Sequence, residues 1–168
     1  MDPFDLLGIE PRFDLDMAMV EIRHRELSRT LHPDRFIGRP PAERRLALDR
    51  AIEVNEAWRI IRNPIARAEA LLSRLGLPSD EESAAQPAPT FLMQMMESRE
   101  ALADARATKD CRELVGLVAT MRVYENTSLA AIVDAFNHDP KSARQYLTEL
   151  RYIRRFLDEA AIVEDELL

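Results

Sequence analysis

The strongest chemical motif in this 168-residue chain is a histidine and an aspartate on either side of a proline, His32-Pro33-Asp34. The imidazole can donate or accept hydrogen bonds, and the carboxylate can accept two from one guanidinium group. Because proline lacks an N–H group and disfavours helix at the residue before it, a helix must end here. The two polar side chains should therefore stand side by side on an exposed turn.

The residues around this tripeptide do not make a catalytic triad or a metal site. A His–Asp pair needs a nucleophile, and Cys111, the one cysteine, lies in the other half of the chain in a charged helical stretch. His24 and His32 would lie about 12 Å apart along a helix, too far to share one ion. The four glycines are scattered, so there is no phosphate-binding loop. We expect no catalytic residue, no metal and no cofactor.

Arginine residues gather just before and after the tripeptide. They are Arg23, Arg25, Arg29 and Arg35. Residues 1–75 carry 13 basic and 13 acidic side chains, whereas residues 76–168 carry 10 and 17, so the net charge of −7 belongs to the second part. A nucleic-acid-binding protein would show a broader basic surface. A local basic face suits an acidic protein partner better, although a solvated helix face is the alternative.

The composition favours a helical protein in the cytoplasm. Apolar residues make up 46% of the chain and charged residues 32%, and glycine is scarce, which favours helix over sheet. Since no apolar run approaches 18 residues, we expect no membrane span and no membrane partner. The first residues have neither the basic nor the apolar region of a targeting segment, and a lone cysteine excludes an internal disulfide.

Helical periodicity places the tripeptide between two long helices. The pattern predicts a short helix over residues 3–7 that ends at Gly8, a second helix over 17–31 and a third over 41–61. A fourth helix should begin at Asn63-Pro64 and end at Gly76. Two long helices that are joined by a short turn tend to lie antiparallel, which puts the tripeptide at the tip of a hairpin.

A proline-rich stretch divides the chain. Residues 77–89 contain three prolines and no helical period, so they predict a linker between one domain over 1–76 and another over 90–168. In the second domain, Thr90 is the expected cap of a helix over 91–107, and a long helix should follow over 110–136.

The last helix should begin at Asp139-Pro140. Its expected inner stripe is Ala143, Leu147, Leu150, Leu157 and Ala161. Three long helices with short connections predict a bundle. With no strand pattern anywhere, the fold class is all-α, a helical hairpin with short flanking helices followed by a three-helix bundle.

The first helix of the bundle has more apolar residues than one core stripe needs. At about 100° per residue, the core stripe is Phe91, Met95, Ser98 and Leu102. The surplus side chains and their acidic rim are Leu92, Met93, Met96, Glu97 and Glu100. Tyr152 points away from the stripe of its own helix, so we expect it to be exposed. Clustered exposed apolar residues, methionine above all, indicate a partner. Deeper burial of this helix, or cover by the linker, is the alternative.

Five segments in this order resemble the HscB family of J-domain proteins. They are Asp-Pro-Phe-Asp-Leu-Leu-Gly-Ile at 2–9, Leu-His-Pro-Asp-Arg-Phe at 31–36, Asn-Glu-Ala-Trp at 55–58, Pro-Ile-Ala-Arg-Ala-Glu-Ala-Leu-Leu at 64–72 and Phe-Leu-Met-Gln-Met-Met-Glu-Ser-Arg-Glu at 91–100. The similarity covers almost the whole chain and is weakest in residues 77–89 and 105–145. Arg35 stands where the family usually has lysine, which keeps the charge.

This resemblance implies a J-type co-chaperone of iron–sulfur cluster assembly, with an L-shaped two-domain arrangement. The tripeptide and the four arginines would contact an ATPase chaperone of the HscA/DnaK class and stimulate its ATP hydrolysis. The patch on the first bundle helix, with Tyr152, would hold the scaffold protein IscU. The protein itself would not be an enzyme. A co-chaperone for a different client, and a structural helical adaptor without chaperone activity, are the alternatives.

Overall fold

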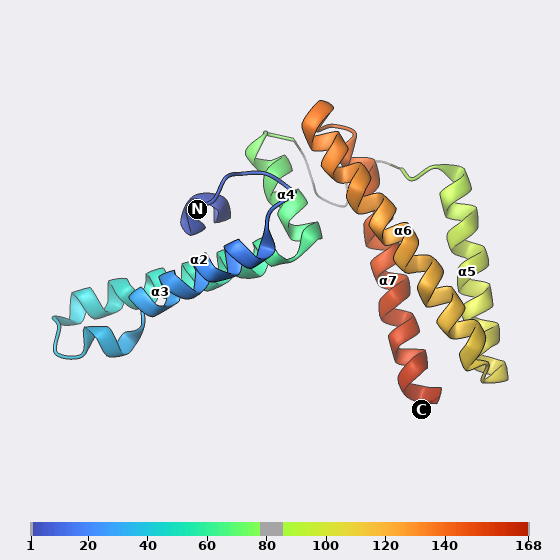
Figure 1. Ribbon diagram of the computed structural model, residues 1–168, viewed down its shortest axis with the longest axis horizontal. Coiled ribbons are helices and arrows are strands. Elements are labelled where there is room, and N and C mark those ends of the chain that lie inside the picture. Colours follow the sequence, from blue (N-terminus) through green and yellow to red (C-terminus); the bar gives the residue numbers. More distant parts are fainter. Residues whose placement is uncertain (1, 78–85, 168) are drawn as a thin grey trace. The chain divides into compact units, whose positions relative to one another are not determined.

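The computed structural model describes residues 2–77 and 86–167, and the regular elements within them are all helices (Figure 1). This confirms the predicted all-α class. Contacts divide the chain into two compact units, Met1–Pro78 and Ser79–Leu168. Most of the predicted linker, residues 78–85, lies outside the described residues. No described helix combines the length and the apolar character that crossing a bilayer requires.

Short-range signals set the helix ends of the first unit. Its elements are α1 (Pro3–Leu7), α2 (Met17–Thr30), the 3-10 helix η1 (Pro33–Phe36), α3 (Pro41–Arg62) and α4 (Pro64–Arg74). Asp16 and Asn63 each accept two backbone N–H groups in the first turn of α2 and α4. Gly8 ends α1 with a φ of 63°, a left-handed conformation that glycine adopts without strain. All four predicted helices are therefore present, with bounds close to those expected.

Helix α3 is the centre of the first unit, because α1, α2, η1 and α4 all pack on it. Its buried side chains are Ala47, Val54, Ala57 and Ile61. Phe4 and Leu7 of α1 and Leu72 of α4 are also fully buried. Burial of each large apolar side chain contributes about 1.5–3 kcal/mol. Leu48 and Ile52 of the same helix are exposed.

His24 joins α2 to α3. Its ring stacks on Trp58 with centroids 5.1 Å apart and planes 11° from parallel. Its Nε2 atom lies 3.0 Å from Oδ1 of Asn55 and 3.2 Å from the hydroxyl of Ser28. The half-buried histidine thus fills the gap that the sequence shows in the apolar stripe of α2.

Arg67 of α4 is a buried cation that lies against the last turn of α3. The residue is only 8% exposed, and one of its terminal nitrogens donates to the carbonyl of Ile61 at 2.8 Å. Its guanidinium carbon lies 4.7 Å from the centre of the Phe13 ring. Burial lowers the pKa of this guanidinium. The carbonyl oxygen, the negative end of a dipole, and the ring face, the negative part of a quadrupole, compensate part of that cost.

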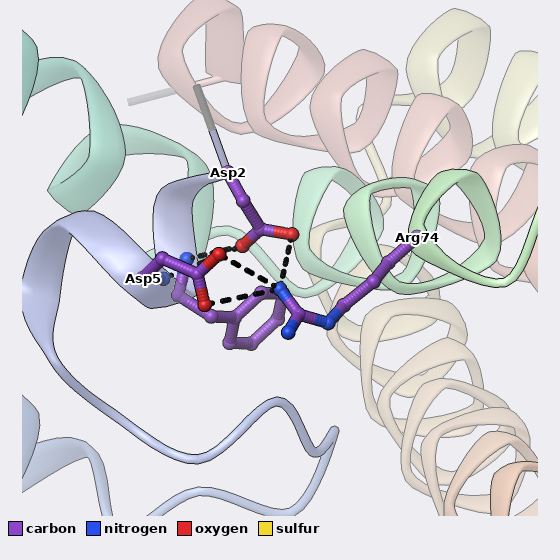
Figure 2. A network of polar contacts seen from close by, with 4 residues as sticks. Asp2, Asp5 and Arg74 are labelled. Atoms are coloured by element: carbon purple, nitrogen blue, oxygen red, sulfur yellow. Dashed lines mark hydrogen bonds and ion pairs between the residues drawn. The ribbon is translucent and has the colours of Figure 1, made fainter.

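A second arginine ties α1 to α4 (Figure 2). Arg74 lies 2.6 Å from Oδ2 of Asp2 and 3.1 Å from Oδ1 of Asp5. The other carboxylate oxygen of Asp2 accepts the N–H of Phe4 at 2.8 Å, so this side chain also caps α1. Partial burial acts to raise the pKa of Asp2, but the hydrogen bonds from Arg74 and the backbone outweigh it and hold that pKa below its ordinary value.

The second unit is a three-helix bundle. It contains α5 (Pro89–Thr108), α6 (Cys111–His138) and α7 (Ala143–Leu167). The expected cap at Thr90 is wrong, because Pro89 opens the helix and Ala88 is its N-cap residue. The expected start at Asp139-Pro140 is also wrong, since residues 139–142 form a turn in which Asp139 accepts the N–H of Lys141.

Helices α5 and α7 run parallel along a seam with regular cross-helix contacts. Phe91 meets Tyr152 edge-on, with ring centroids 6.3 Å apart. Further along, Arg99 pairs with Glu159 at 3.3 Å and Arg106 pairs with Glu166 at 2.6 Å, and both pairs join residues 60 apart in sequence. Helix α6, which is 28 residues long, returns the chain along the whole seam and packs on both partners.

The bundle core is apolar except where α6 meets α7. Met121, Ile132, Leu150, Ile153 and Phe156 are fully buried. Glu125 is buried too, and its two carboxylate oxygens lie 2.9 Å from Arg122 and 2.5 Å from Nε of Arg154. In α7 Ala143 and Ala160 are buried, whereas Ala161, which the sequence predicts to face inward, is exposed.

Candidate functional site

The tripeptide lies where α2 ends and η1 begins, at the tip of the α2–α3 hairpin (Figure 1). Helix α2 ends at Thr30, and His32 has the extended backbone that a following proline favours (φ −58°, ψ 132°). Pro33 then opens η1, a position at which its missing N–H costs nothing. The side chains of His32 and Asp34 are 59% and 78% exposed. Their polar atoms are therefore open to a partner.

Two groups share one nitrogen of His32. Nδ1 lies 3.3 Å from the backbone N of Asp34, which donates to it, and 3.5 Å from the carboxylate of the same residue. A neutral ring with its proton on Nε2 accepts the N–H bond, whereas a protonated ring pairs with the carboxylate. Either contact holds the ring close to the backbone of η1, with Nε2 directed away from both groups.

The four predicted arginines have different surroundings. Arg23 donates from Nε to the carbonyl of Leu7 at 3.2 Å, so it fastens α1 to α2. Arg25 pairs with Glu21 at 2.6 Å. Arg29 and Arg35 are exposed, and their side chains have no hydrogen bond or ion pair within the described part of the chain. Of the four, Arg29 and Arg35 therefore present guanidinium groups without a partner among the described residues.

Three further arginines extend this basic surface, and the sequence analysis missed them. Arg39, Arg44 and Arg45 lie between η1 and the second turn of α3, are exposed, and have no side-chain partner among residues 2–77 and 86–167. The N-terminal end of a helix disfavours cations, so this placement gains nothing from the helix dipole. The signal was the short spacing of these arginines after the tripeptide. We call Arg29, Arg35, Arg39, Arg44 and Arg45 the basic tip.

A pocket of about 420 Å³ lies beside the tripeptide. Pro33 and Asp34 line one side of it, and Arg44 and Leu48 of α3 line the other. Ile37, which is largely exposed, completes an apolar wall. The tip therefore combines a carboxylate, an imidazole, unneutralised arginines and an apolar hollow within a short stretch of chain.

The surplus apolar residues of α5 are found in the second unit. Met93 and Met96 are 63% and 64% exposed, whereas Leu92 is half-buried. Glu97 and Glu100 are exposed beside them. These five residues, together with Tyr152, form what we call the α5 patch. The expected core residues Met95 and Leu102 are buried.

The sequence predicts that Tyr152 is exposed, but in the structure it is half-buried. Its ring packs edge-on against Phe91 of α5, one residue before Leu92. The tyrosine therefore lies at the start of the α5–α7 seam and forms the α7 side of the α5 patch. Helical periodicity of α7 alone could not place it, because its burial comes from a neighbouring helix.

Comparisons with known proteins agree with the sequence resemblance. The family model described as the HSCB C-terminal oligomerisation domain matches residues 87–161. The Co-chaperone protein HscB homolog of Shewanella frigidimarina is 33% identical over 173 residues, which cover 100% of this chain and 99% of that protein. The homolog from Vibrio vulnificus strain YJ016 is 34% identical over 170 residues, with 99% of both chains covered.

Solved structures of HscB proteins also match this chain. Chaperone HscB from Vibrio cholerae matches with a TM-score of 0.86 and 29% identity over the full length of both chains. Human co-chaperone protein HscB, at 24% identity, shares the fold with a TM-score of 0.88 over 98% of this chain and 82% of that one. Sequence identity over the full length, the all-α fold and the order of motifs agree, and the chain therefore belongs to the HscB family of co-chaperones.

Proposed function

We propose that this protein delivers an IscU-type iron–sulfur scaffold to an ATPase chaperone of the HscA/DnaK class and stimulates ATP hydrolysis by that chaperone. The observation that carries the proposal is the exposed tripeptide with the basic tip around it. The protein acts as a regulator of its partner's ATPase, in the cytoplasm, and supplies no catalytic group of its own.

The tip is suited to an acidic partner surface. The five guanidinium groups of the basic tip, which have no partner among the described residues, attract carboxylates and steer the encounter, an effect that salt weakens. Asp34 can then accept a fork of two hydrogen bonds from an arginine of the chaperone. Because Pro33 and η1 fix the backbone at this point, little conformational entropy is lost when the contact forms.

The α5 patch is the proposed scaffold site. Methionine side chains adapt to the shape of an apolar partner, and Met93 and Met96 offer the most exposed apolar surface of α5. Glu97 and Glu100 provide the polar rim that is typical of an interface. The scaffold would thus bind the second unit while the first unit contacts the chaperone.

Steady-state ATP turnover by an HscA-type chaperone tests the proposal. Turnover is measured with and without this protein and IscU, using the natural chain and Asp34→Asn, which keeps the shape of the side chain but removes its charge. We expect joint stimulation by the natural chain and IscU, and loss of at least about tenfold in stimulation with Asp34→Asn, since a charged, bidentate contact is removed.

Other outcomes would revise the proposal in different ways. Stimulation that does not depend on IscU would keep the chaperone contact and reject this scaffold as the client. Absence of stimulation by the natural chain would leave a structural adaptor. Equal loss of helicity in Asp34→Asn would contradict the expectation that the exposed turn adds little to the fold.

A further inference from the structure

An apolar groove of about 390 Å³ lies between α5 and α7, beyond the α5 patch. Leu102 and Val163, both buried, form its floor. Ala103 and Ala107 line the α5 side, where their small side chains leave the space open. Ile162 lines the α7 side and is 59% exposed, so this large side chain lacks full cover within the protein.

Two ion pairs close the ends of the groove. Arg99 with Glu159 lies at the end nearer to the α5 patch, and Arg106 with Glu166 lies at the other end. Since each guanidinium is already neutralised, the groove offers no unpaired charge to orient an ionic ligand. A small polar molecule needs convergent, unpaired polar groups in its site. An aliphatic side chain of a protein partner fits this lining better.

The groove continues the α5 patch along one face of the helix. At about 100° per residue, Leu92, Met96, Arg99, Ala103 and Ala107 fall within an arc of about 80°. On α7, Tyr152 lies at the patch, and Ile162 lies nearly three turns further along at the groove. A partner that covers Leu92 and Met96 and follows the seam would therefore reach the groove directly.

We infer that the groove is a second contact for the scaffold protein, which inserts an aliphatic side chain against Ala103, Ala107 and Ile162. The inference rests on the proposed function, because it takes the α5 patch as the scaffold site. Main-chain groups on either side of the inserted residue would meet the two ion pairs at the ends of the groove, whose outer oxygens and N–H groups remain available for hydrogen bonds. The groove thereby lengthens the interface and fixes the direction of the scaffold along α5.

Two variants of the full chain test this contact. Ala103→Trp fills the groove, and Ile162→Asp places a charge where an aliphatic contact is expected. Affinity for purified IscU is measured by titration calorimetry. We expect each variant to weaken binding by about tenfold, as for the loss of a buried side-chain contact in an interface. Stimulation of the chaperone ATPase without IscU should remain at the level of the natural chain.

Val115→Asp is the matched control. Val115 lies on α6, is 63% exposed and does not line the groove, so this variant introduces the same charge at a similarly exposed apolar position. It should bind IscU like the natural chain. Equal losses in Val115→Asp and Ile162→Asp would mean a general charge effect and would overturn the inference.

A third variant separates this inference from the proposed function. Leu92→Ala with Met96→Ala removes part of the α5 patch and should weaken IscU binding on its own. If it does so while both groove variants bind normally, the groove contact is wrong and the scaffold site stands. If the patch variant also binds normally, or if the natural chain does not bind IscU, the proposed scaffold site fails and the groove contact fails with it.

Discussion

At the scale of single residues, Arg67 shows how a charge can be structural. Its carbonyl partner, Ile61, lies at the end of α3, and its ring partner, Phe13, lies in the connection between α1 and α2. The guanidinium therefore joins three segments of the first unit. The sequence gives no sign of this, because arginine is rarely buried and its periodic position in α4 is compatible with either face.

We predict that Arg67→Lys destabilises the first unit more than Arg67→Met does. An ammonium group is more strongly hydrated and cannot lie flat over Phe13, so its burial costs more, whereas methionine keeps the apolar stem and buries no charge. The expected loss for the lysine variant is about 2 kcal/mol. Urea unfolding followed by fluorescence of Trp58, the only tryptophan, reports on this unit. Equal midpoints for the natural chain and Arg67→Lys would contradict this.

At the scale of elements, the arginines available to a partner on the α2–α3 hairpin lie at its tip rather than along the whole predicted basic helix. Arg23 and Arg25 of α2 are held by internal partners, while Arg44 and Arg45 at the start of α3 have no side-chain partner in the described part of the first unit or elsewhere in residues 2–77 and 86–167. The electrostatic face for the chaperone is therefore expected to include the loop and the first turns of α3.

Arg44→Gln should raise the concentration of protein needed for half-maximal ATPase stimulation by about two- to fivefold, the range of one exposed ion pair. The difference should shrink at high salt, because screening already weakens the contact in the natural chain. Arg62→Gln is the control, since it removes one charge from the same helix about 27 Å from Arg44. An equal effect of both variants would indicate net charge rather than a contact at the tip.

Helix ends could be read from the sequence where one local interaction decides them. Asn63 begins α4 and Gly8 ends α1 as predicted, because caps and left-handed glycine act within a few residues. The starts of α5 and α7 were misplaced, because proline competed with Thr90 in one case and a turn followed Asp139 in the other. Long-range contacts decided which side chains of these helices are buried.

The exposure of the tripeptide follows from local signals, whereas the burial of Tyr152 follows from contacts between helices. Proline and helix periodicity are sufficient to place His32 and Asp34 on an exposed turn. Tyr152 and Ala160 depend on where α5 and α6 lie against α7, which no single-helix pattern contains. The α5–α7 groove cannot be predicted from the pattern of one helix either, since its two walls come from helices about 60 residues apart in the chain.

At the scale of the whole molecule, each unit has its own core, and each proposed site lies within one unit. The tripeptide and the basic tip belong to Met1–Pro78, and the α5 patch belongs to Ser79–Leu168. Substitutions in one site should therefore leave the other site intact, because sites with separate cores and no shared partners contribute independently.

This independence predicts two opposite phenotypes. Asp34→Asn should bind IscU within about twofold of the natural chain while losing ATPase stimulation. Leu92→Ala with Met96→Ala should lose IscU affinity but retain stimulation measured without IscU. Calorimetry and ATP turnover on both variants check the pair. Loss of both activities in either variant would show that the sites depend on each other.

The seam between α5 and α7 has a consequence for how the chain length can change in evolution. Its ion pairs repeat every seven residues on both helices, from Arg99 to Arg106 and from Glu159 to Glu166. Deleting one residue of α5 between them would rotate everything beyond it by about 100° and separate the second pair. We therefore expect α5 to accept insertions and deletions best in steps of about two turns, whereas the turn at 139–142 should absorb single residues.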